Sequence, residues 1–389
     1  MDAPATSLDA SQPWLQLPFD AEEILGGLRG WVECESPTFD AAAVERMLAL
    51  AARDLALLGA RVEHIAGRMG FAGCIRARFP HPAGDAVPGI LVLAHLDTVH
   101  PVGTLTRLPF ERRGGTCRGP GIFDMKGGTY LAVEAMRQLV RAGVTTKLPV
   151  TFLLTPDEEV GSPSTRDLIE AEARRARFVL VPEPARPDGG VVTGRYAIAR
   201  FNLRTTGRPS HAGATLGEGR SAIREMCRQI LAIEAMTTDS CTFSAGVIHA
   251  GQWVNCVATH CDAEVLSMAK RQEDLDAGVA RMLALTSSNP DVVLEVKRGV
   301  TRPVWEPDAG VRALHAEARA IAMGIGFDIP PQSSGGGSDG NFTGAMGIPT
   351  LDGLGVAGAG AHTLDEHIVV SSLVPRARLL AGLFTRLGA

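Results

Sequence analysis

Leu153-Leu-Thr-Pro-Asp-Glu-Glu-Val-Gly-Ser162 joins an apolar run to three consecutive carboxylates and a Gly-Ser turn. The apolar residues at 150–154 predict a buried strand. Carboxylates are costly to bury unless they are paired or bind a cation, and adjacent residues at a strand end point in different directions. One of Glu158 and Glu159 can therefore ligate a metal ion while the other faces a water on that ion. Because most Asp-Glu-Glu runs are solvated loops, this hypothesis depends on ligand-type residues elsewhere.

Two other apolar runs also end in ligand-type residues. Gly89-Ile-Leu-Val-Leu-Ala precedes His95-Leu-Asp97, and this fully apolar run is typical of a central strand covered on both faces. His95 and Asp97 are two residues apart, so they share one face at the carboxyl end of the strand, where open α/β sheets bind ligands. Asp97 could hydrogen-bond the second ring nitrogen of His95 and fix its tautomer. Phe178-Val-Leu-Val-Pro is a further apolar strand, and it ends at Glu183.

Glycine-rich segments carry the remaining candidates. Asp124 lies in Gly119-Pro-Gly-Ile-Phe-Asp-Met-Lys-Gly-Gly128, and His362 follows the glycines at 353–360. A phosphate-binding loop is the rival interpretation of the first segment, but the spacing G-x-x-x-x-G-K-[ST] is missing and Asp124 would repel phosphate. Two histidines with several carboxylates are the ligands expected of a hydrolytic site with two divalent ions, commonly zinc. The candidate ligands are His95, Asp124, Glu158, Glu159, Glu183 and His362.

The length and composition favour a globular, soluble protein of two domains. The chain has 389 residues, of which 45% are apolar and 21% charged, and its net charge is −5. This charge and the low aromatic content of 5% disfavour a nucleic-acid surface. No apolar run reaches the roughly 18 residues of a membrane helix. The seven scattered cysteines and the absence of a signal-peptide pattern at the start lead us to expect a cytoplasmic protein without a disulfide framework.

The pattern of strands and helices changes in the middle of the chain. Residues 194–303 alternate as β-α-β-β-α-β, which indicates a ferredoxin-like α+β module. An α/β pattern precedes this module and resumes after it. We therefore predict a first part of an α/β domain at 1–193, an inserted second domain at 194–303, and the second part of the α/β domain at 304–389.

These motifs in combination resemble the zinc-dependent aminoacylase and carboxypeptidase family, which includes glutamate carboxypeptidases, acetylornithine deacetylases and succinyl-diaminopimelate desuccinylases. The resemblance is greatest to the bacterial glutamate carboxypeptidases and spans nearly the whole chain. It implies a mixed-sheet, three-layer α/β/α catalytic domain with an inserted dimerisation, or lid, domain. The matching segments are His95-Leu-Asp97, Gly119 to Asp124, Glu158-Glu159, Pro182-Glu-Pro184, Gly207-Arg-Pro-Ser-His211-Ala-Gly213, Val254-Asn255, Gly335-Gly-Gly-Ser-Asp339 and His362.

The resemblance also implies roles for individual residues. His95 and Glu183 would hold one metal ion, Glu159 and His362 the other, and Asp124 would bridge them, often with a cis peptide bond after it. The ions would most readily be Zn²⁺, with Co²⁺ or Mn²⁺ as alternatives.

Glu158 would be the general base that takes a proton from the metal-bridging water and later gives it to the leaving amine. Asp97 would orient His95. His211 would reach the site of a partner subunit and donate to the oxyanion, which implies a homodimer through the inserted domain. Asn255, Gly336 and Gly337 would contact a small amide substrate.

One position departs from the family pattern. Glutamate carboxypeptidases carry an Arg about thirteen residues after the Asn, where two parallel N–H donors hold the free carboxylate of the substrate. The corresponding residue here is Met268. We therefore expect a substrate other than a standard C-terminal glutamate, or a carboxylate held by another residue. The acyl group, and whether the bond is peptide, acyl-amide or ureido, stay open.

Two alternatives compete with the metal hydrolase. Gly336-Gly-Ser338-Asp-Gly340 fits the G-x-S-x-G nucleophile elbow, and His362 follows in the right order for a serine hydrolase. The elbow requires a buried strand before the serine, however, and Pro-Pro-Gln-Ser-Ser stands close before it. The second alternative is a binding protein of the same family without activity. Such proteins usually lose a ligand or the base, whereas this chain has them all.

Overall fold

The computed structural model describes residues 12–84 and 86–388, and the chain divides into two units. The first unit contains the chain up to Gly194, residues 306–333 and the chain from Ser338 onward. The second contains residues 195–305 together with 334–337. The short glycine-rich loop at 334–337 thus groups with the inserted unit, although the sequence-based boundaries of 194–303 left it out.

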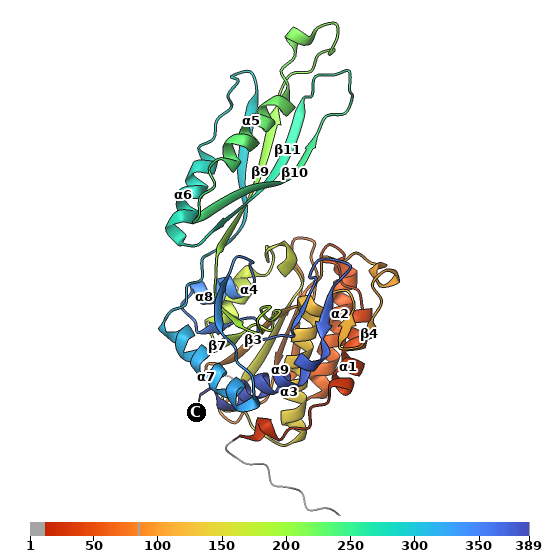
Figure 1. Cartoon of the computed structure of the whole chain (residues 1–389), viewed down its shortest axis with the longest axis vertical. Helices are drawn as coiled ribbons and strands as arrows, with labels where there is room; N and C mark the ends of the chain where they lie inside the picture. The colour runs from red at the N-terminus through yellow and green to blue at the C-terminus, as the bar shows by residue number, and fades with distance from the viewer. Residues whose placement is uncertain (1–11, 85, 389) are drawn as a thin grey trace, which may run out of the picture. The chain divides into compact units, whose positions relative to one another are not determined.

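A six-stranded mixed sheet forms the centre of the first unit (Figure 1), in the order β1-β2-β6-β3-β7-β14. Strands β6, β3, β7 and β14 run parallel, whereas β1 and β2 are antiparallel to their neighbours. The strands are β1 (Arg61–Ile65), β2 (Cys74–Arg78), β3 (Gly89–His95), β6 (Val150–Thr155), β7 (Ala176–Leu180) and β14 (Thr350–Leu351).

Helices cover both faces of this sheet because its central strand is apolar on both sides. Ile90 and Val92 of β3 belong to the larger core, which also contains residues of α1, α2, α3, α7 and α9. Leu91 and Leu93 belong to a smaller core with residues of α4 and α8. The helices are α1 (Ala21–Glu33), α2 (Ala41–Leu57), α3 (Gly127–Arg141), α4 (Arg166–Ala173), α7 (Ala309–Ile325), α8 (Gly340–Ala345) and α9 (Leu373–Arg386). The predicted three-layer α/β/α class is confirmed.

Two small sheets complete the first unit. One has the order β15-β16-β5-β4 and the other pairs β13 with β8. In the first of them, β16 pairs with β5, which precedes the segment that contains Asp124. Their strands are β4 (Glu111–Arg113), β5 (Thr116–Arg118), β8 (Val191–Arg195), β13 (Pro331–Ser334), β15 (Gly358–Ala359) and β16 (His367–Val369).

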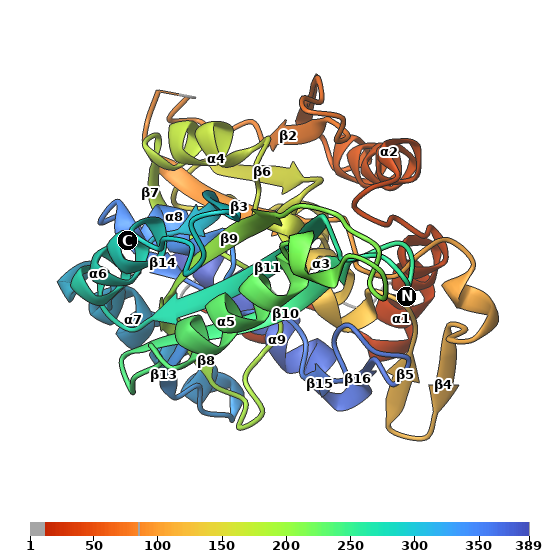
Figure 2. The same cartoon turned by 90° about the horizontal axis from the view of Figure 1, so that it is seen from above.

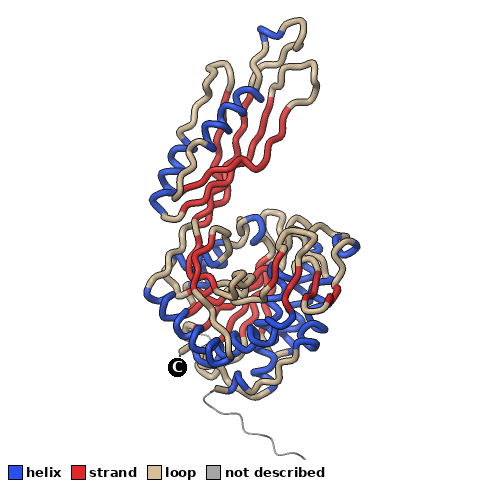
Figure 3. The backbone as a smooth tube through the Cα atoms, in the orientation of Figure 1, coloured by secondary structure: helices blue, strands red, loops and turns tan. Residues whose placement is uncertain are grey.

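The second unit is a four-stranded antiparallel sheet with two helices on one face (Figures 2 and 3). The strand order β10-β11-β9-β12 is that of the predicted ferredoxin-like fold. Alternate residues of β9, such as Phe201 and Leu203, are buried with α5 and α6, and the residues between them are exposed. The elements are β9 (Ala197–Thr206), α5 (Ala222–Glu234), β10 (Cys241–Ala250), β11 (His260–Ala269), α6 (Gln272–Leu283) and β12 (Val293–Arg302).

Within residues 12–84 and 86–388, no helix is both long and apolar enough to cross a membrane.

Candidate metal centre

The sheet order brings three of the candidate segments to one edge. Strands β6, β3 and β7 are adjacent and parallel, so their carboxyl ends meet. His95 is the last residue of β3. Glu158 and Glu159 follow β6 in a single 3-10 turn, and Glu183 follows β7. The sequence pattern, in which apolar strands end in ligand-type residues, predicted that these side chains come from neighbouring strand ends. The structure places them there.

Asp124 and His362 come from irregular backbone rather than from strand ends. Asp124 has φ −116° and ψ 100° within a distorted helical turn, and the peptide bond to Met125 is cis, as the family resemblance implies. His362 has a positive φ of 65° between β15 and β16. Gly128 lets the start of α3 approach closely, since a Cβ there would lie 1.8 Å from the carbonyl oxygen of Pro182. That approach places the Asp124 segment against the segment that carries Glu183.

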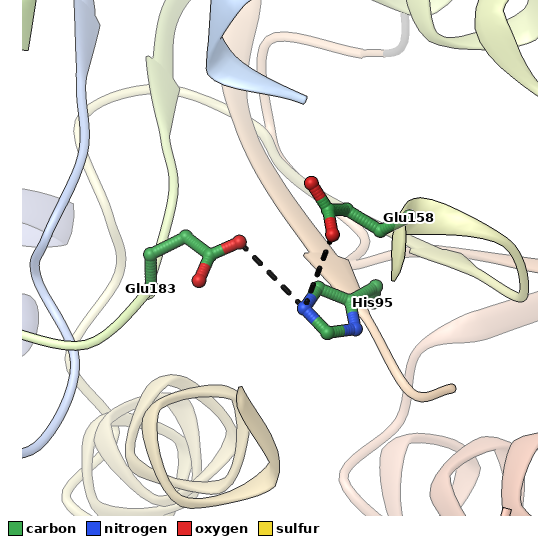
Figure 4. Close-up of side chains that lie close together, drawn as sticks. All are labelled: His95, Glu158 and Glu183. Carbon is green, nitrogen blue, oxygen red and sulfur yellow. Dashed lines mark ion pairs between the residues drawn. The ribbon is translucent and has the colours of Figure 1, made fainter. Parts of the chain in front are cut away.

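Three carboxylates surround the Nε2 atom of His95, which is 1% exposed. Figure 4 shows two of them, those of Glu158 and Glu183. Its distances are 3.3 Å to Asp124 Oδ1, 3.6 Å to Glu183 Oε1 and 3.9 Å to Glu158 Oε2. Among the described residues, this buried nitrogen has no hydrogen-bond partner of acceptable geometry. A buried polar atom that faces several carboxylates without bonding to one of them is the arrangement expected around a cation.

A second imidazole faces the other side of Asp124. His362 Nε2 lies 3.3 Å from Asp124 Oδ2 and 3.1 Å from Glu159 Oε2. The two oxygens of Asp124 are thus directed at two different histidines. Glu159 Oε1 is also buried without a hydrogen-bond partner in the part of the chain that the structure describes. Ligand atoms of His95, Glu158 and Glu183 lie within 4.8 Å of one another, and so do those of His95, Asp124 and Glu159. His362 adjoins the second of these groups. Imidazole nitrogens and carboxylate oxygens placed in this way are suited to bind a divalent cation.

The electrostatics of the centre support the same conclusion. Burial opposes protonation of His95, but Asp124 and the other carboxylates outweigh it and raise its pKa well above the usual value. The interactions of His362 with Asp124 and Glu159 raise its pKa to about 10. Burial and then the charge of Asp124 raise the pKa of Glu183. These shifts arise from burial and from the crowding of carboxylates, and a cation bound among them would relieve the same repulsion.

Asp97 ties the separate segments together behind the ligands, and it is fully buried. Its Oδ1 lies 3.4 Å from His95 Nδ1, which is also 3.0 Å from the main-chain oxygen of Asp97. The carboxylate accepts the backbone N–H groups of Glu158 (3.2 Å) and Glu159 (3.3 Å) and the hydroxyl of Thr38 (2.8 Å). Asp97 thus contacts His95 as expected, and it additionally anchors the Glu-Glu turn.

The other predicted site residues lie on the second unit. His211 and Asn255 are in neighbouring exposed loops, where Ala212 N–H donates to the Asn255 carbonyl (2.9 Å). The N–H groups of Gly213 and Ala214 donate to His211 Nδ1, both at 3.1 Å. In the neutral ring the proton is therefore on Nε2, the atom that could donate to an oxyanion.

Met268 and the glycine loop also belong to this unit. Met268 is half-buried on β11 and pairs with Ile198 of β9. Gly336 accepts a hydrogen bond from the Arg195 guanidinium (2.6 Å). At Gly337 a Cβ would lie 2.6 Å from Ile198 Cδ1, so a larger residue does not fit there.

The geometry does not favour the serine hydrolase. Ser338 is buried, and its hydroxyl donates to Asp352 Oδ2 at 2.6 Å. His362 Nε2 faces Asp124 and Glu159 instead. A nucleophilic serine needs a histidine that accepts its proton and an acidic residue that orients that histidine, and Ser338 and His362 are not paired in this way.

Sequence reasoning missed Glu366 and gave His100 no role. Glu366 is 1% exposed, and its carboxylate lies 2.6 Å from His100 Nε2. The two residues are 266 positions apart, and no local sequence pattern marks either of them as part of the site. Their only signal was proximity to His95 and His362 in the sequence.

The fold and the site together define a metal-dependent hydrolase. Residues 91–386 match the model of Peptidase family M20/M25/M40. Carboxypeptidase G2 of Pseudomonas sp. (strain RS-16) is 31% identical over 317 residues, which cover 79% of this chain and 75% of that protein. Succinyl-diaminopimelate desuccinylase of Acinetobacter baylyi is 28% identical, over 76% of this chain and 82% of that protein. The chain belongs to the M20/M25/M40 peptidase family.

Solved structures agree on the fold. The M20 family metallo-carboxypeptidase Sso-CP2 of Sulfolobus solfataricus superposes with a TM-score of 0.73 at 14% identity, over 94% of this chain and 99% of that one. Human carnosine dipeptidase 1 superposes with a TM-score of 0.74 at 15% identity, over 96% and 98%. At these low identities the superpositions support the fold alone.

Proposed function

We propose that this protein hydrolyses an amide bond of a small substrate with the help of two divalent metal ions. His95 and Glu183 would hold one ion, Glu159 and His362 the other, and Asp124 both. The observation that carries the proposal is the placement of Asp124, whose Oδ1 and Oδ2 each lie 3.3 Å from a different imidazole. Zn²⁺ suits these ligands best, and Co²⁺ and Mn²⁺ are alternatives. When bound, such ions polarise the substrate carbonyl and lower the pKa of a shared water.

Glu158 is the proposed general base. Its side chain is 11% exposed beside His95, and it is the carboxylate next to, rather than within, the Asp124–His362–Glu159 group. As the water oxygen bonds to the carbonyl carbon, Glu158 takes the proton of that water. It then delivers the proton to the amine nitrogen as the C–N bond breaks.

We further propose a homodimer through the second unit, in which His211 donates from Nε2 to the oxyanion in the partner's site. Trp253 and Val254 support this, because they are 73% and 102% exposed directly before Asn255. The test mixes His211→Ala with Glu158→Gln chains under conditions that exchange subunits. If the sites are shared, about a quarter of wild-type activity returns, since half of random dimers are mixed and each has one intact site. If His211 acts within its own chain, no activity returns.

Met268 is the basis for the proposed substrate class. It cannot hold a carboxylate with two N–H donors, so we propose an apolar or uncharged group in place of a C-terminal glutamate. The names of the relatives, a carboxypeptidase and a desuccinylase, fit cleavage of either a peptide or an N-acyl amide bond.

The experiment is a panel of N-acyl amino acids, dipeptides, ureido compounds and simple amides. Protein stripped of metal is assayed with Zn²⁺, Co²⁺, Mn²⁺ or no addition. The proposal expects amide hydrolysis that requires metal, with no labelling of Ser338 by a serine-directed phosphonate. Activity that survives complete removal of metal, or phosphonate labelling that abolishes it, would favour the serine hydrolase. Bound metal without activity on any of the amides would favour a binding protein. The cytoplasmic location stays a prediction from the sequence.

A further inference from the structure

Glu366 is a buried carboxylate to which no role has been given above. It stands one residue before β16 and four residues after His362. We propose that Glu366 is a positioning residue of the metal centre, which fixes the Asp124 segment against the His362 segment. This inference rests on the proposed function, because it concerns the same ions.

Four donors converge on the Glu366 carboxylate. Its Oε1 accepts the backbone N–H groups of Phe123 (2.8 Å) and Asp124 (3.0 Å). Its Oε2 accepts the N–H of Gly121 (2.9 Å) and faces His100 Nε2 (2.6 Å). A carboxylate has about four lone-pair positions, so its capacity as an acceptor is fully used.

The Asp124 segment needs such an acceptor because its backbone is irregular. Gly121 has a positive φ of 69°, and Asp124 departs from helical geometry. Buried N–H groups that lack a regular partner destabilise a conformation, and here three of them are satisfied by one side chain. The N–H of Asp124 itself is one of the three, so the carboxylate acts directly on the residue that faces both histidines.

The same side chain belongs to the segment that carries the second histidine. Strand β16 pairs with β5, with Ile368 opposite Cys117, and β5 leads into the Asp124 segment. Glu366 therefore joins two irregular segments whose ligands, Asp124 Oδ2 and His362 Nε2, are 3.3 Å apart. Loss of this link should lengthen that distance or make it variable, because the N–H groups of Gly121, Phe123 and Asp124 would lose their shared acceptor.

Zn²⁺ titration of metal-free protein, in competition with a chromogenic chelator, tests the inference. Glu366→Gln keeps the shape of the side chain but replaces one carboxylate oxygen with an NH₂ group. That group is itself a hydrogen-bond donor, so it cannot accept the N–H groups that Glu366 accepts. We expect the affinity of the weaker ion to fall about 10- to 100-fold, as for other residues that orient metal ligands. Cobalt-substituted protein should show an altered visible spectrum in the same variant.

Glu225→Gln is the matched control. Glu225 is 2% exposed in the second unit, and it accepts Ser288 N–H (2.7 Å), Ser288 Oγ (2.6 Å) and Gln229 Nε2 (2.8 Å). The chemical change is the same, and each carboxylate is buried and accepts several hydrogen bonds, but no candidate ligand contacts Glu225. Its melting temperature should fall while its Zn²⁺ affinity and cobalt spectrum stay those of the wild type.

Each outcome decides between positioning and packing. Wild-type metal affinity in Glu366→Gln would overturn the inference and leave Glu366 as a structural residue. If Glu366→Gln does not fold, Glu366→Asp is measured, whose shortened side chain cannot reach all four donors. A loss of at least about tenfold is then expected, and an unchanged affinity overturns the inference. If the wild type itself binds no metal, the proposed function fails instead.

Discussion

Adjacent carboxylates with different tasks give the sharpest test of the site. Glu158 Oε2 lies 3.9 Å from His95 Nε2, whereas Glu159 Oε2 lies 3.1 Å from His362 Nε2. Glu158 faces His95, as Asp124 Oδ1 does, but at the longer distance. Glu159 faces His362 together with Asp124 Oδ2, and both of those distances are shorter. We therefore predict that Glu158→Gln and Glu159→Gln fail in different ways although the residues are neighbours.

Glu158→Gln should retain both metal ions and lose turnover. General acid–base catalysis contributes about 10²- to 10⁴-fold, so kcat should fall by that factor, or by about 2.7–5.4 kcal/mol in the activation free energy. KM should change little, since the ligands that face the substrate carbonyl remain. Glu159→Gln should instead lower the affinity of one ion by at least about tenfold, or 1.4 kcal/mol, and excess metal should restore part of its activity.

The assay pairs steady-state kinetics with metal content after dialysis against a defined free-metal concentration. Far-UV circular dichroism and thermal melting serve as controls for folding in both variants. The assignment of roles is refuted if Glu158→Gln loses metal and is rescued by excess metal, or if Glu159→Gln keeps both ions at wild-type affinity. An exchange of the two phenotypes would mean that Glu159 is the general base and Glu158 the metal ligand.

Three further predictions concern other parts of the chain. Asp97→Asn replaces one of the oxygens that accept the N–H groups of the Glu-Glu turn, so we expect about 10- to 100-fold weaker metal binding or activity and a loss of about 1–3 kcal/mol in the free energy of unfolding. Metal titration and urea unfolding check this, and unchanged values in both would contradict it. Met268→Arg should gain activity on N-acyl glutamates in a kcat/KM comparison, and strong hydrolysis of these compounds by the wild type would refute the substrate proposal. Iodoacetamide at pH 8 should label the exposed Cys227 and Cys256 in folded protein but not Cys74, because burial raises the pKa of that thiol to about 12. Mass spectrometry of the native and unfolded protein checks this, and labelling of Cys74 before unfolding would contradict the fold.

Much of the ligand group could be predicted because it follows from strand topology. His95, Glu158, Glu159 and Glu183 each follow an apolar run, and parallel strands place such residues at one edge. This reasoning needs only local patterns. The division of labour between Glu158 and Glu159 did not follow from the pattern, because either residue of the pair could face a metal ion.

The residues that support the ligands could not be predicted in the same way. Glu366 accepts backbone N–H groups more than 240 positions away, and no local pattern distinguishes it from a solvated loop residue. The glycines at 335–337 likewise have no intrinsic preference for one unit. They group with the second unit because Gly337 packs against Ile198 and Arg302. Such contacts depend on tertiary structure, which the order of residues reveals only through similarity to a known family.

Anomalous diffraction from a crystal grown with Zn²⁺ would locate the ions and the side chains that hold them. We expect two peaks at the carboxyl edge of the sheet, one contacted by His95 and Glu183 and the other by Glu159 and His362, with an oxygen of Asp124 on each. A single peak, or peaks that none of these side chains contacts, would contradict it.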